Sequence, residues 1–343
     1  MVQTRRTAAA AAAAAVAAKP TAAATPANNS NTTAPTTTAA AATATATTKN
    51  NARFNAEAAA WDSNPFIQAM SAEAWRAIQH NVTCFRDSSD AGRPARPDVL
   101  EIGCGTGTLS LLVAPHARQL VAVDAAEGMV EVLRGKLADN AQSNAEADAD
   151  DGDKGGDDDE GENKKKKDKS RLPKKDFRNV VPICVMLEDP EDPNLPPGTQ
   201  EQQQEPDRGG VGGRPDRIKF DLVISHLVLH HIPELAPVLA TMLGCLKPGG
   251  AVALTDFEDF GPAARRFHPE GKMEGVERHG IEREAMRRLM HDVGFVDVRV
   301  EGAWTARKSV ERFPGEFGDQ AEGGEGAGEE MEFPFLICTG KRP

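Results

Sequence analysis

Short apolar runs alternate along the chain with segments whose apolar residues recur at helical spacing. The run 220–225 is almost continuously apolar, as expected of a strand buried on both faces. Strands are predicted, in chain order, at 98–102, 119–123, 180–187, 220–225, 251–255, 296–300 and 333–339. Helices are predicted at 53–82, after Gly107, at about 126–140, up to Leu246 and at 282–293.

Helices separate most of these strands, and this alternation predicts a mostly parallel sheet. The last two strands follow one another without a helix between them, which predicts an antiparallel hairpin at one edge. The predicted fold class is therefore α/β. We expect a doubly wound, Rossmann-like, mostly parallel sheet of seven strands with an antiparallel terminal strand, in three α/β/α layers.

Turn-forming residues interrupt the first predicted helix at 61–65. Proline is well tolerated in the first turn of a helix, and a short polar side chain before it can cap the free N–H groups. We therefore expect Asp62 or Ser63 to cap a helix that begins near Pro65.

Several stretches have too little apolar surface to offset the entropy of ordering them. Residues 1–52 are predicted to be a disordered Ala/Thr-rich tail. Residues 53–343 are predicted to form one catalytic domain with low-complexity inserts at about 144–170, 189–216 and 314–332.

The formal net charge of −12 comes largely from the acidic inserts. A general nucleic-acid binder would show a basic face, so no nucleic-acid partner is expected. No apolar run approaches membrane-spanning length, so no membrane partner is expected either.

Five cysteines without a CxxC pair indicate a reducing compartment, and a cytoplasmic location is predicted. The alternative is mitochondrial, because no acidic residue precedes Glu57 while basic residues do, a composition shared with transit peptides.

A glycine-rich turn joins the strand at 98–102 to the helix that follows it. Gly103, Gly105 and Gly107 are spaced GxGxG, and Thr108 stands where an NAD-binding GxGxxG motif has its third glycine. Asp124 ends the next strand, where an acid in a βαβ unit reaches the ribose of a bound nucleoside. Glu101 lies inside the first strand and could attract a cationic amino or sulfonium group.

These motifs resemble those of the class I S-adenosylmethionine-dependent methyltransferases, and most closely the small-molecule type with an LHH segment after strand four. The resemblance rests on 99–110, Asp124, 220–231 and 247–250, and it covers roughly 55–143, 172–188 and 217–341. It implies S-adenosyl-L-methionine as the cofactor. The cofactor-binding residues that it implies are Glu101, Gly103, Cys104, Gly105, Gly107, Asp124, Met129, Glu188 and Ser225. Glu188, Asp189 or the backbone could contact the adenine.

A hydroxyl or carbon acceptor would also need a base. The candidates are His226, His230 and His231, together with the acids Asp256 and Glu258. His226 is the best placed because it directly follows a buried strand. Each of these rings could instead pack against the sheet or cap the backbone. Asp256, Glu258, His268 and His279 follow strand five, and because Asp256, Glu258 and His268 match no known ligand spacing, no metal site is predicted.

The predicted function is methyl transfer to a small-molecule acceptor, bound under the first helix and the 260–280 loop. The run 225–228 lacks the Asn/Asp-Pro-Pro-aromatic pattern of many amide and base methylators. Two alternatives remain open: an NAD(P)-dependent oxidoreductase, which the missing third glycine disfavours, and a non-catalytic cofactor-binding scaffold. The oligomeric state is left open.

Overall fold

A computed structural model describes residues 51–85, 96–150, 176–198, 216–318 and 327–343. The predicted tail lies outside these ranges except for residues 51 and 52, which begin a helical segment at 51–61. Most of each predicted insert also lies outside the described residues.

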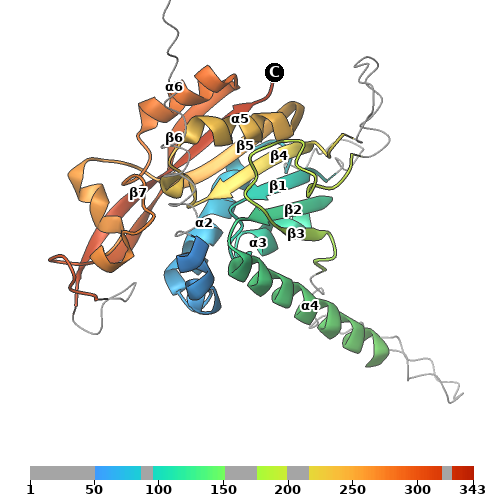
Figure 1. Cartoon of the computed structure of the whole chain (residues 1–343), viewed down its shortest axis with the longest axis horizontal. Helices are drawn as coiled ribbons and strands as arrows, with labels where there is room; N and C mark the ends of the chain where they lie inside the picture. Colours follow the sequence, from blue (N-terminus) through green and yellow to red (C-terminus); the bar gives the residue numbers. More distant parts are fainter. Residues whose placement is uncertain (1–50, 86–95, 151–175, 199–215, 319–326) are drawn as a thin grey trace, which may run out of the picture.

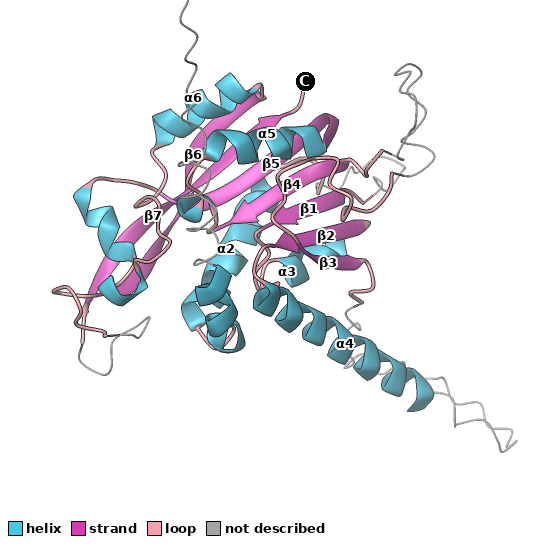
Figure 2. Ribbon diagram, in the orientation of Figure 1, coloured by secondary structure: helices cyan, strands magenta, loops and turns pink. Residues whose placement is uncertain are grey.

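Seven strands form one sheet in the order β3-β2-β1-β4-β5-β7-β6 (Figures 1 and 2). They are β1 Asp98–Ile102, β2 Gln119–Asp124, β3 Val180–Cys184, β4 Phe220–His226, β5 Leu246–Phe257, β6 Val296–Val310 and β7 Glu329–Lys341. Neighbouring strands from β3 to β5 pair in parallel, whereas β7 runs antiparallel to both β5 and β6. The predicted fold class is confirmed.

Alternating side chains of β1 serve two different cores. Val99 packs with α2 (Pro65–Asn81), α3 (Ser110–Val113) and α4 (Glu127–Asp150) on one face of the sheet. Leu100 packs with α5 (Leu235–Cys245) and α6 (Arg283–Val293) on the other. Neither residue is exposed to solvent. The predicted three-layer arrangement follows from this period-two alternation.

Short 3₁₀ helices complete the described elements. They are η1 Ala114–His116, η2 Leu229–His231, η3 Pro262–Phe267 and η4 Glu270–Lys272. The last two lie in the predicted 260–280 loop, which therefore contains two short helical turns.

Two elements extend into stretches expected to be inserts. Helix α4 continues to Asp150 and projects from the body of the protein, well past the predicted end near Asn140 (Figure 1). Its last turns contain several alanines, the residue with the highest helix propensity. Strand β7 begins at Glu329, because its exposed first residues pair with the far end of β6 at Val310.

Strand lengths differ from the predictions in two further places. β5 begins at Leu246, before the predicted start at Ala251, because Leu246 pairs with Phe220 across a bulge. β3 ends at Cys184 rather than Leu187. The backbone beyond Cys184 leaves the sheet, and Leu187 packs in the α5 and α6 core instead.

The predicted cap of the second helix is wrong. Asn64, rather than Asp62 or Ser63, accepts a hydrogen bond from the Phe66 N–H at 2.8 Å. Asp62 turns away to accept a hydrogen bond from the Thr106 hydroxyl at 2.6 Å and to pair with Lys136. The turn before α2 is thereby tied to the glycine-rich turn.

Within the described part of the chain, no helix combines the length and the apolar character that crossing a membrane requires.

Gly107 is expected to be essential to the stability of the turn. Its φ is +83°, and a Cβ atom there would lie 2.4 Å from a Leu133 methyl carbon. The substitution Gly107→Ala should lower the free energy of unfolding by about 1–3 kcal/mol, because the left-handed backbone and the clash act together. Urea unfolding measures this.

Gly135→Ala is the matched control, because an added Cβ at this position in α4 meets nothing within 4 Å. It should raise stability by about 0.5–1 kcal/mol, the helix-propensity difference between glycine and alanine. Equal unfolding midpoints for Gly107→Ala and the unaltered protein would contradict the role assigned to Gly107.

Candidate functional site

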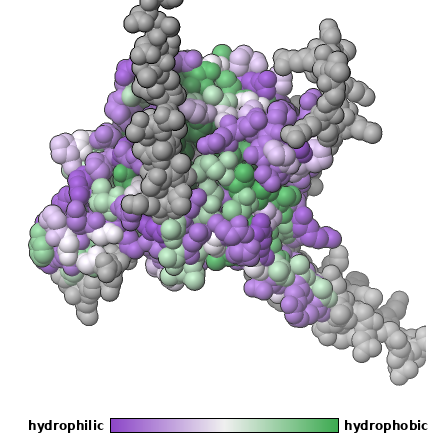
Figure 3. Space-filling view, viewed as in Figure 1, coloured by the Kyte–Doolittle hydropathy of each residue, from purple (hydrophilic) through white to green (hydrophobic). Residues whose placement is uncertain are grey.

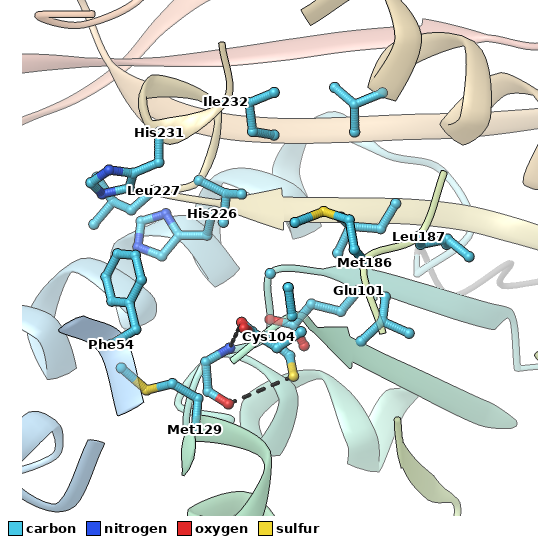
Figure 4. Close-up of a pocket in the computed structure, with 18 of the residues that line it drawn as sticks. Phe54, Glu101, Cys104, Met129, Met186, Leu187, His226, Leu227, His231 and Ile232 are labelled. Carbon is cyan, nitrogen blue, oxygen red and sulfur yellow. Dashed lines mark hydrogen bonds between the residues drawn. The ribbon is translucent and has the colours of Figure 1, made fainter. Parts of the chain in front are cut away.

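A cavity of about 630 Å³ lies at the carboxyl ends of the parallel strands (Figure 4). Its wall combines the glycine-rich turn, the ends of β2 and β4, the segment after β3 and the helical segment 51–61. In the space-filling view, hydrophobic residues gather near the centre of the molecule between hydrophilic ones (Figure 3). The residues that line the cavity include Phe54, Glu101, Gly103, Cys104, Gly105, Asp124, Met129, Met186, Glu188, His226, Leu227 and His231.

The three glycines of the turn all have positive φ, but for different reasons. A Cβ atom on Gly103 would lie 2.3 Å from a Val228 methyl carbon, so this glycine permits close packing against the segment after β4. Gly105 has open space where a Cβ would point, and it lines the cavity. Gly107 packs against Leu133 and is absent from the cavity wall.

Asp124 connects the two turns that form one side of the cavity. Its carboxylate accepts hydrogen bonds from the N–H groups of Gly105 and Ala126, both at 2.8 Å. Burial raises the Asp124 pKa, and these two hydrogen bonds oppose that rise. A carboxylate has about four lone-pair positions, so both oxygens keep a free position for a ligand hydroxyl.

Glu101 is a buried acid behind the turn, with a side chain 2% exposed. Its carboxyl accepts a hydrogen bond from the Ser110 hydroxyl at 2.5 Å. Burial raises the Glu101 pKa to about 8, the Ser110 hydrogen bond opposes the rise, and the Asp124 charge adds to it. A cation in the cavity would favour the ionised form of this acid.

Cys104 and Met129 also line the cavity and are both buried. Burial, together with the charges of Asp124 and Glu101, raises the pKa of the Cys104 thiol well above its usual value. The thiol therefore stays protonated and serves as a small apolar wall residue rather than a nucleophile.

The segment after β3 brings Glu188, but not Asp189, to the cavity. The backbone carbonyl of Glu188 accepts a hydrogen bond from Thr241 at 2.8 Å, which holds this segment against α5. Asp189 instead accepts the N–H of Glu191 at 2.8 Å. Of the two acids considered for the adenine, only Glu188 is in place to contact a ligand.

Ser225 is absent from the cavity wall. Its hydroxyl is buried and donates to the Ile102 carbonyl at 2.8 Å, joining β4 to the end of β1. The hydrogen bond thus gives this residue a structural position, although the resemblance implied a cofactor contact.

The candidate bases separate into two groups. His226 and His231 line the cavity, whereas His230 does not and is only 2% exposed. The His230 Nδ1 lies 2.8 Å from one oxygen of the Asp256 carboxylate and 3.0 Å from the other. Figure 4 shows the His226 ring between the end of β4 and the glycine-rich turn, with His231 beyond it.

His226 has the environment of an uncharged base. Burial lowers its pKa to about 4. Its Nδ1 lies 2.9 Å from the Thr255 hydroxyl, and that hydroxyl in turn donates to the Ser225 carbonyl at 3.5 Å. The pattern assigns the proton to Nδ1, and the buried Nε2 has no partner among the described residues.

The remaining acids after β5 are engaged elsewhere. Glu258 forms a two-point ion pair with Arg283, at 3.0 and 2.9 Å. His279 does not line the cavity, nor does His268, whose ring lies 5.0 Å from that of His230.

Sequence reasoning missed Phe54 and Leu227. Phe54 lies in an alanine-rich segment, and no pattern in that segment indicates that its side chain lines a cavity. Its ring packs edge-on against the ring of His231, with 5.2 Å between the ring centres. Leu227 has a φ of +56°, an unusual conformation for a non-glycine residue, directly after β4. Such strain is concentrated at ligand-binding edges, but it is not visible in a sequence.

Contacts between residues far apart in the sequence hold the segment that carries Phe54. The neighbouring Arg53 guanidinium donates to the carbonyls of Lys272 and Glu274, at 3.0 and 2.6 Å. Lys272 also pairs with Glu57 at 2.6 Å. The segment 51–61 is therefore tied to the 260–280 loop, although no residue of that loop lines the cavity.

Comparison with known proteins agrees with this architecture. Residues 66–300 match a family described as a methyltransferase domain. An uncharacterised methyltransferase of Schizosaccharomyces pombe is 23% identical over 185 residues, which are 53% of this chain and 47% of that protein. The match thus spans about half the length of this curated relative.

Solved structures also resemble the chain, at low sequence identity. The YcgJ protein of Bacillus subtilis has a TM-score of 0.47 at 13% identity, covering 79% of this chain and 98% of that one. The N-methyltransferase NodS of Bradyrhizobium japonicum, solved with S-adenosyl-L-homocysteine, has a TM-score of 0.42 at 15% identity, covering 87% and 98%.

The family match covers more than half of the chain and includes the glycine-rich turn, Asp124 and the segment after β4. It decides against the nicotinamide-dependent oxidoreductase considered from the sequence. The chain belongs to the methyltransferase-domain family, and its predicted identity as a class I S-adenosylmethionine-dependent methyltransferase is confirmed.

Proposed function

We propose that this chain transfers the methyl group of S-adenosylmethionine to a small-molecule acceptor bound beside Phe54, His226 and His231. One observation carries the proposal. One cavity is lined both by Gly105 and Asp124 and by these three rings. Its volume of about 630 Å³ lies within the range of pockets for small ligands.

The donor would occupy the end of the cavity formed by the turn. Asp124 has free acceptor positions for two ribose hydroxyls, and Gly105 allows the ligand to approach the backbone closely. Glu101 supplies negative charge for the amino or sulfonium group once it ionises. Met129 and Glu188 are available to flank the adenine.

Methyl transfer from a sulfonium is an in-line displacement that depends mainly on orientation and the exclusion of water. An acceptor hydroxyl must also lose a proton. The bare Nε2 of His226 is suited to receive that proton, because its Nδ1 proton is held by Thr255. His226 is accordingly the proposed base.

A small acceptor fits the charge and the lining of the site. The chain carries a net charge of −12, so it has no general attraction for nucleic acid. The helical segment 51–61 contributes Phe54 and Trp61 to the cavity wall, and contacts with Lys272 hold the segment in place. The rings of Phe54 and His231 offer an apolar surface to the acceptor.

Incubating the protein with radiolabelled S-adenosylmethionine and a fractionated cell extract tests the acceptor class. Label recovered among small molecules is the expected outcome. Label on protein or RNA would contradict the proposal. Binding of the cofactor with no labelled product in any fraction would favour a non-catalytic scaffold.

Asp124→Asn should weaken binding of S-adenosylhomocysteine by about 10- to 100-fold, since a hydrogen bond to a charged group contributes about 1.5–3 kcal/mol. Isothermal titration calorimetry measures the dissociation constant. Asp189→Asn, just outside the cavity, is the matched control and should bind as the unaltered protein does. If Asp124→Asn also retained full affinity, the ribose would lie elsewhere.

His226→Gln should lower kcat by about 10²- to 10⁴-fold, the usual contribution of a general base, with little change in cofactor affinity. The unlabelled extract fraction that yields the labelled small molecule serves as the source of acceptor. His291→Gln, on the exposed face of α6, is the control and should keep full activity.

The pH profile gives a second test of His226. A base must be unprotonated, so activity that depends on it is lost as the pH falls through its pKa. Since burial lowers that pKa to about 4, kcat/KM should show no loss from this group between pH 7 and about pH 5. A decline centred near pH 6.5, the ordinary pKa of histidine, would contradict the buried, uncharged ring.

A further inference from the structure

Three histidines from two separate segments converge beside the cavity. His230 and His231 belong to η2, which follows β4, and His268 follows η3. One ring nitrogen of each lies within 4.8 Å of the others. The ring centres are 4.0, 5.0 and 5.8 Å apart for the pairs 230–231, 230–268 and 231–268.

Hydrogen bonds fix the orientation of two of these rings. The buried Asp256 carboxylate accepts from the His230 Nδ1 and also from the backbone N–H groups of His230 and Phe257, at 3.1 and 2.9 Å. The Gly275 carbonyl accepts from the His231 Nδ1 at 2.8 Å. Both acceptors require a proton on Nδ1, which leaves Nε2 of each ring with a free lone pair.

The third ring contains a polar atom that nothing in the described structure satisfies. The Nδ1 of His268 is shielded from solvent and has no hydrogen-bond partner among the described residues. Phe257 and Phe267 pack around the ring, with centres 5.8 and 5.0 Å away. Leaving such an atom unpaired costs about 1–3 kcal/mol, so a missing partner is expected.

Charged groups around the three rings act in opposite directions on a bound cation. Arg53 and Lys308 lie near enough to oppose a cation, whereas the Asp256 carboxylate, held against His230, favours one.

Ring packing alone is the alternative explanation. It accounts for the 4.0 Å separation of His230 and His231. It does not account for the unpaired His268 nitrogen, nor for the carboxylate and carbonyl that hold Nδ1 of the other two rings. Such outer partners are typical of metal-bound histidine.

We propose that His230, His231 and His268 bind one divalent transition-metal ion of the Zn²⁺ type, with Asp256 and the Gly275 carbonyl as positioning groups. At a Zn–N distance of about 2.0–2.1 Å, tetrahedral ligands lie about 3.4 Å apart. The three nitrogens, now within 4.8 Å, would close by about an ångström through ring rotation.

This site revises the expectation of no metal, which followed from linear spacing. It is independent of the proposed acceptor class, but it adjoins the cavity through His231, which is a ligand and a lining residue at the same time. A bound His231 would no longer serve as a base, and His226 would be the one free imidazole among the described lining residues.

Zinc binding by the full chain, prepared without a polyhistidine tag, tests the proposal. The protein is stripped with a chelator, dialysed and titrated with Zn²⁺ against a competing chromophoric chelator. We expect one Zn²⁺ per chain. His268→Gln should weaken binding by more than about 100-fold and Asp256→Asn by about 10- to 100-fold, as outer partners of metal-bound histidine do. His291→Gln, in α6, should bind as the unaltered protein does.

Cobalt provides a readout that needs no variant. Co²⁺ in the unaltered protein should give the visible absorption bands of a tetrahedral nitrogen and oxygen site. Intense near-ultraviolet bands from sulfur ligation would overturn the proposal, since they would place the metal on a cysteine. So would the absence of stoichiometric Zn²⁺ uptake, or undiminished affinity in a folded His268→Gln. None of these results depends on methyl transfer.

Discussion

The hydrogen bonds that Asp124 accepts from Gly105 and Ala126 are the constraint on which the cavity depends. They join the turn after β1 to the turn after β2, and the parallel register places those two turns side by side. The backbone N–H groups of Gly103 and Cys104 strengthen this junction by donating to the Val123 carbonyl. The acid that is proposed to bind the ribose therefore also holds together the two turns that form this part of the cavity wall.

The strands and the glycine-rich turn could be predicted from the sequence. The spacing of apolar residues and of glycines depends only on neighbouring positions in the chain. The bounds of β1 agree with the predicted ones, and Asp124 and Gly105 lie together as their spacing indicated. The helix cap was wrongly predicted at Asp62 or Ser63 because several polar neighbours compete for that role, and the tertiary contact of Asp62 with Thr106 leaves it to Asn64. His268 joins the other histidines only through the fold.

The histidines at the end of β4 and in η2 have different surroundings. His226 has a buried Nε2 without a partner among the described residues, because Thr255 holds its other nitrogen. His230, four residues further on, faces the core and is held by Asp256. His231, the next residue of η2, lines the cavity instead, because a 3₁₀ turn directs successive side chains to different surroundings.

The helical segment 51–61 affects where along the chain the functional unit begins, because its residues line the cavity. The region that matches the family begins at residue 66, after this segment. A chain that began at residue 66 would keep the residues of all seven strands, but it would lose Phe54 from the cavity wall and Arg53 from its contacts with the 272–274 backbone. The residues that form the sheet are therefore fewer than the residues that enclose the cavity.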